Sequence, residues 1–427
     1  MNKPPRKWYR LDNAGLMYSS LQQERYSAIY RISAVMEQPV DTQALQRAID
    51  KTMPRFPTFS VRMRRGLFWY YFEPNDAPGP FVKKDISDPC QPIRYNEDNG
   101  WLVRFYAYKH RISIECFHAL ADGSGSLTFF RTLLAVYLRE IGVDVPSDSG
   151  VLDISEPPRP EEQEDAYARY AALRTAWRAP RHKSAYQNVG TPEPFYTFHV
   201  TMGFVPVDQL HAKAREYGAS ITEYLSAVLI WAILEKQKQE KPYRERPVAL
   251  AVPVNLRGLF PSETLRNFII TVRPVIDPAL GDYTFPEIVA QVHHYLRLHA
   301  TRQELRAMIT GNVRVQSNRL LQLVPVFIKN PVILLNYRLR GTRPYSATFT
   351  NPGVFKVPAA MQPHIRHMEV VLGQATIPRV HCASISYGNQ MEITFAGTLK
   401  ETDTEREFFR FLVREGLPVH VESNRTE

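Results

Sequence analysis

The feature that most constrains the fold is a strand that runs directly into a helix within residues 111–134. In its first part Ile112, Ile114 and Cys116 alternate with polar residues, which is the period-2 pattern of a half-buried strand. In the second part the apolar residues recur at helical spacing, at Leu127, Phe130, Leu134, Tyr137 and Ile141. The chain must therefore reverse within a few residues, and the fold must accommodate a tight corner between a strand and a helix.

The corner holds two residues that suit acid–base chemistry, His118 at the end of the predicted strand and Asp122 four residues later. An imidazole with an ordinary pKa of about 6.5 is largely neutral at neutral pH, so it can accept a proton from a hydroxyl or an amine. We therefore predict that His118 is a general base. A carboxylate inside a turn needs a cation or backbone N–H groups as partners, so Asp122 is predicted to be a scaffold residue. Gly123 is expected to supply the permissive φ and ψ angles of the reversal.

A second stretch, residues 247–275, contains a strand-like run that ends in Asn255-Leu256-Arg257, and a second apolar strand that begins at Asn267. Together with the His118 to Asp122 corner, this order resembles the chloramphenicol-acetyltransferase-like superfamily. That group includes condensation domains of peptide synthetases, alcohol acetyltransferases and polyketide-associated acyltransferases. The resemblance implies that His118 is the catalytic base and that Arg257 forms a salt bridge with Asp122, the structural aspartate. It also implies that Asn267 is the asparagine of a later Gly-Asn pair, although position 266 is Arg here.

Other stretches extend the resemblance from about residue 11 to about residue 417. Thr350-Asn351-Pro352-Gly353 looks like the turn that follows a core strand in condensation-type domains, and LDNAGLMYSSLQQERY resembles the start of the family. Condensation domains that form peptide bonds usually have two adjacent histidines, whereas Phe117 precedes His118 in this chain. The single histidine resembles the O-acylating branches and favours an alcohol as the acceptor. The DFGWG signature of the plant branch is absent.

The resemblance implies an α+β fold of two chloramphenicol-acetyltransferase-like sandwich lobes, arranged as a V-shaped pseudo-dimer with a tunnel between them. The sequence agrees, because both halves mix helix-like and strand-like segments and lack a G-x-G-x-x-G fingerprint. We expect the N-terminal lobe in residues 1–185 and the C-terminal lobe, with the Asn255-Leu256-Arg257 crossover segment, in residues 186–427. An acidic, proline-flanked and helix-like stretch at residues 161–177 is expected to link them.

In the second lobe Ser220 and Glu223 predict a capping box at the start of a long helix. A final helix is expected at residues 404–414. The strand-like segments of this lobe are residues 195–205, 332–337, 347–349, 367–372, 382–387 and 391–397.

Length and composition limit the number of domains and the cellular compartment that we expect for this chain. The 427 residues, 44% of them hydrophobic, suffice for two domains with cores of their own. No apolar run approaches the length of about 18 residues that a membrane span needs, and MNKPPRKWYRLDN lacks the apolar segment of a secretory signal. Cys90, Cys116 and Cys382 lie far apart, which suggests a reducing compartment and no metal cluster. We therefore expect a cytoplasmic monomer without a metal site.

The net charge of +10 raises the question of an anionic partner. The basic residues are scattered and no nucleic-acid-binding motif is present, so nucleic acid is not expected. The resemblance instead implies that basic residues attract the phosphates of coenzyme A, or an acidic carrier protein that bears a phosphopantetheine thioester.

These observations predict an O-acyltransferase that moves an acyl group, such as acetyl, from a coenzyme A or carrier-protein thioester to a small alcohol. His118 would be the base, and no cofactor would be tightly bound. Possible substrate-binding residues are Ser126, Asn267 and Asn351. Two alternatives stay open, a condensation-type domain that forms amides and a non-catalytic module that binds a carrier protein.

Overall fold

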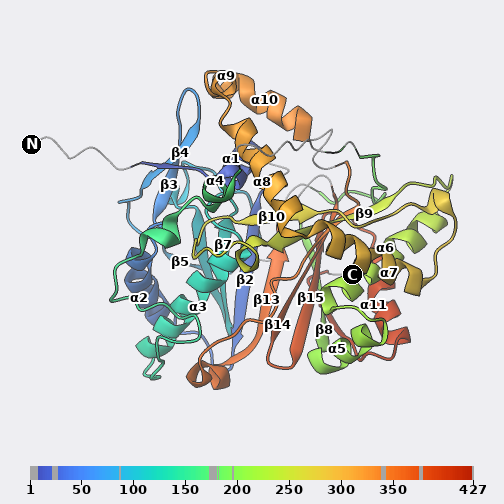
Figure 1. Ribbon diagram of the computed structural model, residues 1–427. Helices are drawn as coiled ribbons and strands as arrows, with labels where there is room; N and C mark the ends of the chain where they lie inside the picture. The colour runs from blue at the N-terminus through green and yellow to red at the C-terminus, as the bar shows by residue number, and fades with distance from the viewer. Residues whose placement is uncertain are drawn as a thin grey trace, which may run out of the picture.

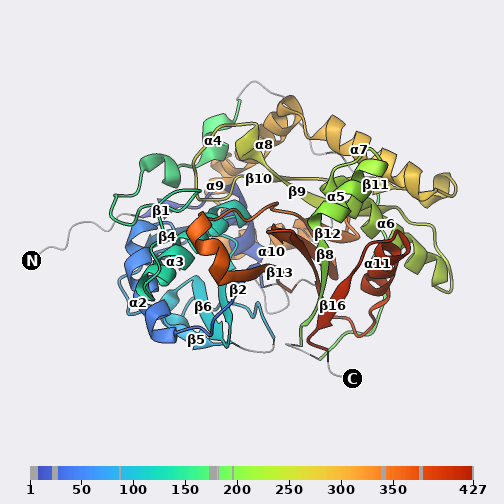
Figure 2. The same ribbon diagram turned by 90° about the horizontal axis from the view of Figure 1, so that it is seen from below.

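The computed structural model describes residues 8–21, 27–85, 88–172, 180, 182–194, 197–337, 343–374 and 378–425. Two large mixed sheets lie side by side, one in the N-terminal part of the chain and one in the C-terminal part (Figure 1). Seen from below, most of the helices lie on the outer sides of the two sheets (Figure 2). The predicted α+β fold with two lobes is therefore confirmed, whereas the tunnel between the lobes stays a prediction.

The N-terminal sheet has five strands in the order β13-β2-β7-β6-β5. Their bounds are Ile365–Leu372 (β13), Ile29–Met36 (β2), Arg111–Phe117 (β7), Val103–Tyr108 (β6) and Val82–Lys84 (β5). Strand β2 pairs antiparallel with both β7 and β13. Because β13 comes from the C-terminal half of the chain, this sheet joins segments from both predicted domains. The predicted boundary at residue 185 stays a prediction.

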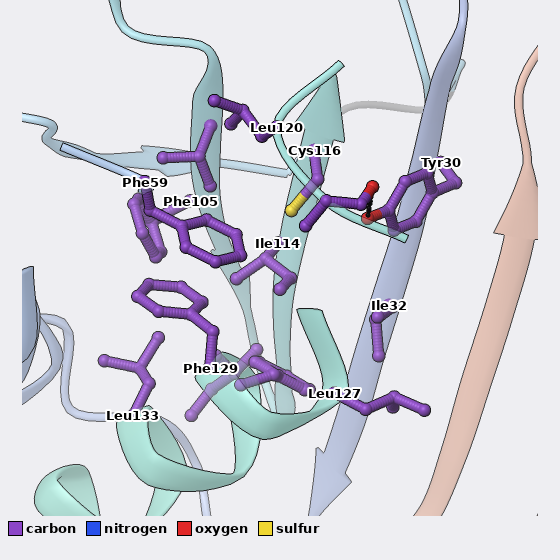
Figure 3. Packing of buried hydrophobic residues seen from close by; sticks show 14 of the residues in the cluster. Tyr30, Ile32, Phe59, Phe105, Ile114, Cys116, Leu120, Leu127, Phe129 and Leu133 are labelled. Carbon is purple, nitrogen blue, oxygen red and sulfur yellow. Dashed lines mark hydrogen bonds between the residues drawn. The ribbon is translucent and has the colours of Figure 1, made fainter. Parts of the chain in front are cut away.

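Two helices cover one face of this sheet, α2 (Thr42–Thr52) and α3 (Gly123–Glu140). Phe59 and Phe129 stack with ring centroids 4.5 Å apart, and Phe105 of β6 lies against Phe129 (Figure 3). Such buried aromatic contacts contribute about 0.5–1.5 kcal/mol beyond the burial of their surface. They hold α3, and thus the corner before it, against the sheet. A small sheet of β1 (Tyr9–Arg10), β4 (Tyr70–Pro74) and β3 (Val61–Arg65) lies beside this lobe.

The C-terminal sheet has eight strands, in the order β10-β9-β12-β14-β15-β8-β16 with β11 on β9. Their bounds are Ile269–Val272 (β10), Val248–Asn255 (β9), Ala347–Thr350 (β12), Val380–Tyr387 (β14), Gln390–Gly397 (β15), His199–Pro206 (β8), His420–Ser423 (β16) and Val275–Ile276 (β11). The strands predicted at residues 347–349, 382–387 and 391–397 are confirmed in this sheet, whereas the strand predicted at residues 367–372 is β13 and belongs to the N-terminal sheet. The strand predicted at residues 195–205 is described from His199 onward, and residues 195 and 196 lie outside the described part.

Helices α5 (Val207–Glu216), α6 (Ile221–Gln239), α7 (Phe285–His299) and α11 (Asp403–Arg414) accompany the second sheet. The predicted capping box is present, because the Ser220 hydroxyl accepts from the Glu223 N–H while the Glu223 carboxylate accepts from the Ser220 N–H. Helix α6 buries residues on all its sides because it lies between α7, α11 and β9. The second lobe therefore has an apolar core of its own.

The strand predicted at residues 332–337 is wrong. These residues belong to α10 (Val326–Asn336) and its C-cap, which follows α8 (Arg302–Gln316) and α9 (Arg319–Gln322). A short apolar run such as Val332 to Leu335 has the same pattern in a strand and in a helix. The proline at N-cap position 325 favours the helix, because its fixed φ suits a helix start and the missing N–H costs nothing there.

The acidic stretch at residues 161–177 is not one helix. It forms a 3₁₀ turn at Pro160–Gln163 and a short helix α4 (Ala166–Tyr170), while residues 173–179 lie outside the described part. Glu164 is the C-cap of the 3₁₀ turn, and Asp165 is the N-cap of α4, where its carboxylate accepts from the Ala168 N–H at 3.2 Å. Nor is this charge run a solvated face throughout, because Glu162 is buried and pairs with Arg55 at 2.6 Å.

Candidate functional site

His118 follows β7 directly and begins the turn that leads into α3. Its backbone N–H donates to the Ala28 carbonyl at 2.8 Å, which extends the pairing of β7 with the residue before β2. The Leu120 N–H donates to the Phe117 carbonyl at 2.9 Å and closes the turn. Asp122 is then the N-cap of α3 and accepts from the Gly125 N–H at 3.0 Å. The strand end and the helix cap therefore fix the backbone on both sides of His118.

Asp122 and Arg257 form the predicted ion pair, with Nη1 of Arg257 2.8 Å from Oδ2 of Asp122. The same Oδ2 accepts from the Phe268 N–H at 2.7 Å. Arg257 also donates to the carbonyl oxygens of Thr264 and Arg266, at 2.9 and 2.7 Å through Nη2. This network connects the corner of the first lobe to the segment between β9 and β10 of the second.

Gly123 does not have the predicted role in the reversal. Its φ is not positive, and a Cβ added at this position would meet nothing within 4 Å. The glycine that the structure needs is Gly125, where a Cβ would lie 2.0 Å from the Leu265 carbonyl oxygen. The helix start needs a glycine at position 125 because the segment that includes Leu265 crosses it closely. The turn itself does not need a residue with positive φ.

The His118 ring lies against Asn267 and two tyrosines. Its Nδ1 is 3.1 Å from Oδ1 of Asn267. On one side Tyr18 stacks on the imidazole, with centroids 4.1 Å apart and planes at 20°. Tyr30 meets the ring edge-on at 4.9 Å and 68°. The ring is thus held from three sides by side chains of α1 (Asn13–Leu21), β2 and the segment before β10.

The hydrogen bonds of Asn267 determine which nitrogen of His118 carries the proton. Nδ2 of Asn267 lies 3.0 Å from the His118 carbonyl and 3.4 Å from Oδ1 of Asp12, and both of these groups are acceptors when Asp12 is ionised. The amide nitrogen must therefore face them, which leaves the amide oxygen toward the ring. Nδ1 of His118 then donates to this oxygen, and Nε2 of the neutral ring has the free lone pair.

Burial shifts the pKa values of His118 and Asp12, the two titratable groups that Asn267 connects. It lowers the pKa of His118 below its ordinary value, against the raising effects of hydrogen bonds and of the Asp122 charge. Burial also raises the pKa of Asp12 to about 6, although Arg266 lies 3.5 Å away and favours the carboxylate. At neutral pH the imidazole is therefore neutral, and Asp12 is mostly ionised.

Sequence reasoning missed Asp12, Tyr18 and Tyr30. Asp12 had a local signal, because an aspartate precedes a helical run and accepts from the Gly15 N–H at 2.7 Å as a cap would. The arginine at position 266 is explained by the same residue, since Arg266 pairs with Asp12 and donates to the Arg10 carbonyl at 2.7 Å. For the tyrosines no pattern pointed to the ring.

The two other predicted substrate-binding residues, Ser126 and Asn351, form hydrogen bonds with residues other than His118. Ser126 is buried and its hydroxyl is 2.5 Å from that of Tyr30, so it reaches the ring only through Tyr30. Asn351 follows β12, where it donates to the Thr222 hydroxyl at 3.1 Å and accepts from the Gly353 N–H. Of the three possible substrate-binding residues, Asn267 alone has a hydrogen bond to His118 in the described structure.

Within the described residues, no group of three or more His, Cys, Asp or Glu side chains could hold a metal ion. The cysteines Cys90, Cys116 and Cys382 are all free and buried. No single helix of the described part has the length and apolarity to cross a membrane, and one pair bent by 77°, α5 with α6, passes on those two criteria.

No protein-family model and no curated protein matches the chain. Solved structures do. The chain is similar to polyketide synthase associated protein 5 from Mycobacterium tuberculosis, at 17% identity and a TM-score of 0.62 over 96% of this chain and 98% of that one. It is similar to trichothecene 15-O-acetyltransferase from Fusarium sporotrichioides, at 8% identity and a TM-score of 0.59 over 95% and 94%.

A third similar structure is the first condensation domain of the CDA synthetase, at 15% identity and a TM-score of 0.57 over 96% of both chains. These proteins belong to the chloramphenicol-acetyltransferase-like superfamily. The chain therefore has the fold of this superfamily along almost its full length.

Proposed function

We propose that this chain, which has the chloramphenicol-acetyltransferase-like fold, is an acyltransferase that moves an acyl group from a thioester to an alcohol. The observation that carries the proposal is the geometry of His118, whose Nδ1 lies 3.1 Å from the amide oxygen of Asn267, an arrangement that leaves the lone pair of Nε2 free in the neutral ring. A half-buried neutral imidazole with this tautomer suits a general base, and such catalysis contributes about 10²- to 10⁴-fold in rate.

In the proposed reaction Nε2 of His118 takes the proton of the acceptor hydroxyl while the oxygen attacks the thioester carbonyl. A tetrahedral oxyanion forms. When it collapses, the carbon–sulfur bond breaks, the thiolate leaves, and the imidazolium returns the proton to sulfur. The products are an ester and a free thiol, with no covalent enzyme intermediate.

Asn267 and Asp12 would support the charged ring during this step. The imidazolium has a second positive site at Nδ1, which already faces the amide oxygen of Asn267. The Asp12 carboxylate lies behind the same amide, so its charge favours the imidazolium across one hydrogen-bonded group. Asp122 would not exchange protons, because Arg257 and two backbone N–H groups occupy its oxygens. Its proposed role, with Arg257, is to hold the corner in place.

The similar structures and the residue before His118 suggest the class of donor and of acceptor. Structures similar to this chain include an O-acetyltransferase and a starter condensation domain in complex with C8-CoA and Leu-SNAC. We propose coenzyme A or a phosphopantetheine carrier as the bearer of the thioester. The phenylalanine before His118, where peptide-forming domains have a second histidine, favours an alcohol over an amine.

The test is a product assay with acetyl and octanoyl coenzyme A, each offered a panel of primary and secondary alcohols and the matching amines. Mass spectrometry identifies ester or amide, and a thiol reagent measures release of coenzyme A. We expect ester formation with at least one alcohol. Amide formation alone would replace the proposal by the condensation alternative. The alternative of a binding module would be supported if thiol release with every donor–acceptor pair were no faster than in buffer alone and the protein formed a complex with a phosphopantetheinylated carrier.

A further inference from the structure

The helices α9 and α10 have an unusually apolar solvent-facing surface. Seven of their side chains and of the link between them are between 47% and 77% exposed, namely Leu320, Leu321, Leu323, Phe327, Ile328, Val332 and Leu335. Monomeric proteins usually expose such residues singly, and a contiguous group marks a place of interaction. Both helices lie at the upper edge of the molecule in Figure 1, away from the two sheets.

The tip of the hairpin between β3 and β4 continues this surface. Its Leu67 and Trp69 are 62% and 46% exposed. The hairpin is joined to α10 by three hydrogen bonds, from the Val326 N–H to the Leu67 carbonyl, from Lys329 to the Phe68 carbonyl, and from Asn330 to the Tyr70 hydroxyl. The seven side chains of the helices and the two of the hairpin therefore form one continuous surface, which we call the apolar ridge.

The charged residues of the elements that form the apolar ridge are mostly basic. The segment from α9 to α10, residues 319–336, contains Arg319 and Lys329 and no aspartate or glutamate. Arg319 at the start of α9 is exposed, and so is Arg65 in the hairpin. The acid of the hairpin, Glu73, is already paired with both Arg62 and Arg64. Anything that covers the ridge thus meets apolar side chains flanked by positive charge.

We propose that the apolar ridge binds the surface of an anionic lipid bilayer. Helices that lie in the headgroup region bury an apolar face and place basic residues beside anionic lipids. Helix α10 has 11 residues and is too short to span a bilayer, which fits a helix that lies in the interface. The ridge is formed by projecting helices and a hairpin tip, and a flat, negatively charged surface is complementary to that shape and charge.

This binding would bring the candidate site close to lipid. Helix α10 packs against α1, the helix that holds Tyr18 against His118. Asn13 at the start of α1 also bonds Gln316 of α8. A bilayer on the ridge would therefore be separated from the imidazole by one layer of helices, within reach of acyl chains or acceptors dissolved in the membrane.

The test measures co-sedimentation with vesicles of phosphatidylcholine and of an equimolar mixture of phosphatidylcholine and phosphatidylglycerol. The wild type should bind the anionic vesicles and lose affinity as salt is added. The double variant Phe327→Ser/Leu335→Ser should bind these vesicles at least about tenfold more weakly. The single variant Arg319→Gln should bind them about fivefold more weakly. The control pair Val413→Ser with Val421→Ser, on α11 and β16, should bind as the wild type does.

Trp69 gives a second readout that needs no change in the ridge helices. Its fluorescence should shift to the blue with anionic vesicles, and the shift should be absent in Trp69→Phe. Failure of the wild type to bind either vesicle would overturn the proposal. So would a ridge variant that binds as well as the wild type. A wild type that is dimeric by light scattering, and becomes monomeric in the ridge variant, would show that a second copy covers the ridge instead. None of these readouts depends on acyl transfer.

Discussion

Replacing Arg257→Met tests the role of the ion pair that joins the two lobes. The Asp122 side chain is only 1% exposed and that of Arg257 is 16% exposed, so the pair is largely removed from water. The substitution leaves Asp122 charged, with the N–H groups of Gly125 and Phe268 as its remaining partners. It also removes the donors to the carbonyl oxygens of Thr264 and Arg266.

The expected cost follows from this geometry. Removing one partner of a buried ion pair destabilises a protein by about 3–5 kcal/mol, because the other charge stays buried without compensation. An unfolding entropy of about 2.1 cal/mol/K per residue gives roughly 0.9 kcal/mol/K for 427 residues that unfold together. The Tm of the variant should therefore fall by about 3–6 °C. The proposed reaction should slow by about 10- to 100-fold, because the corner that holds His118 loses its anchor.

Thermal and urea unfolding of five proteins measures the effect. They are the wild type, Arg257→Met, Asp122→Asn, the double variant and the control Arg366→Met. Arg366 forms an exposed pair with Glu37 at 3.1 Å, which should contribute less than about 1 kcal/mol. The double variant should lose less stability than the two single variants together, by about 1 kcal/mol or more. A Tm for Arg257→Met within the range of the control would refute the scaffold role, and additive single effects would refute the coupling.

Three further predictions concern protonation and packing. The kcat/KM of acyl transfer should fall toward acid pH with a midpoint below pH 6.5, because burial lowers the pKa of His118 from its ordinary value and only protonation of the ring removes its lone pair; a midpoint above pH 6.5 would contradict this. Asp12→Asn should be more stable than the wild type at pH 8, by up to about 3 kcal/mol in urea unfolding. The reason is that a carboxyl group with a folded pKa of about 6, above its unfolded value of 3.8, loses its stabilising contribution as the pH rises through 6, so the advantage should disappear by about pH 4. Gly125→Ala should lower the free energy of unfolding by about 1–3 kcal/mol, because its Cβ would lie 2.0 Å from the Leu265 carbonyl oxygen. The matched Gly123→Ala should have little effect, because a Cβ there meets nothing within 4 Å. Equal Tm values for the two variants would contradict the close crossing at Gly125.

The corner around His118 could be predicted because its determinants are local. The alternation of β7, the helical spacing of α3 and the charge at Asp122 all lie within one short stretch, and the structure has each element where the pattern put it. The resemblance to a known family added Arg257, whose pairing with Asp122 spans 135 residues. No periodicity in the chain would have supplied that contact.

The missed features depend on segments that are distant in sequence. Asp12 reaches Asn267 across 255 residues, and neither residue stands in a pattern that refers to the other. Gly125 needs to be glycine because a segment near Leu265 crosses it closely, and local turn geometry, which favours Gly123, contains no sign of that crossing. Residues 332–337 fit a strand as well as a helix in sequence, because four consecutive apolar residues have no period and only the packing around them decides their conformation.

The account depends most on Nε2 of His118 as the base of acyl transfer. The most direct measurement is the rate of thiol release from an acyl coenzyme A, with an alcohol that the wild type acylates, for His118→Ala beside His211→Ala. His211 is an exposed histidine of α5 and serves as the matched control. We predict a loss of about 10²-fold or more for His118→Ala at an unchanged Tm, and wild-type turnover for the control. Turnover by His118→Ala within a few-fold of the wild type would contradict the account.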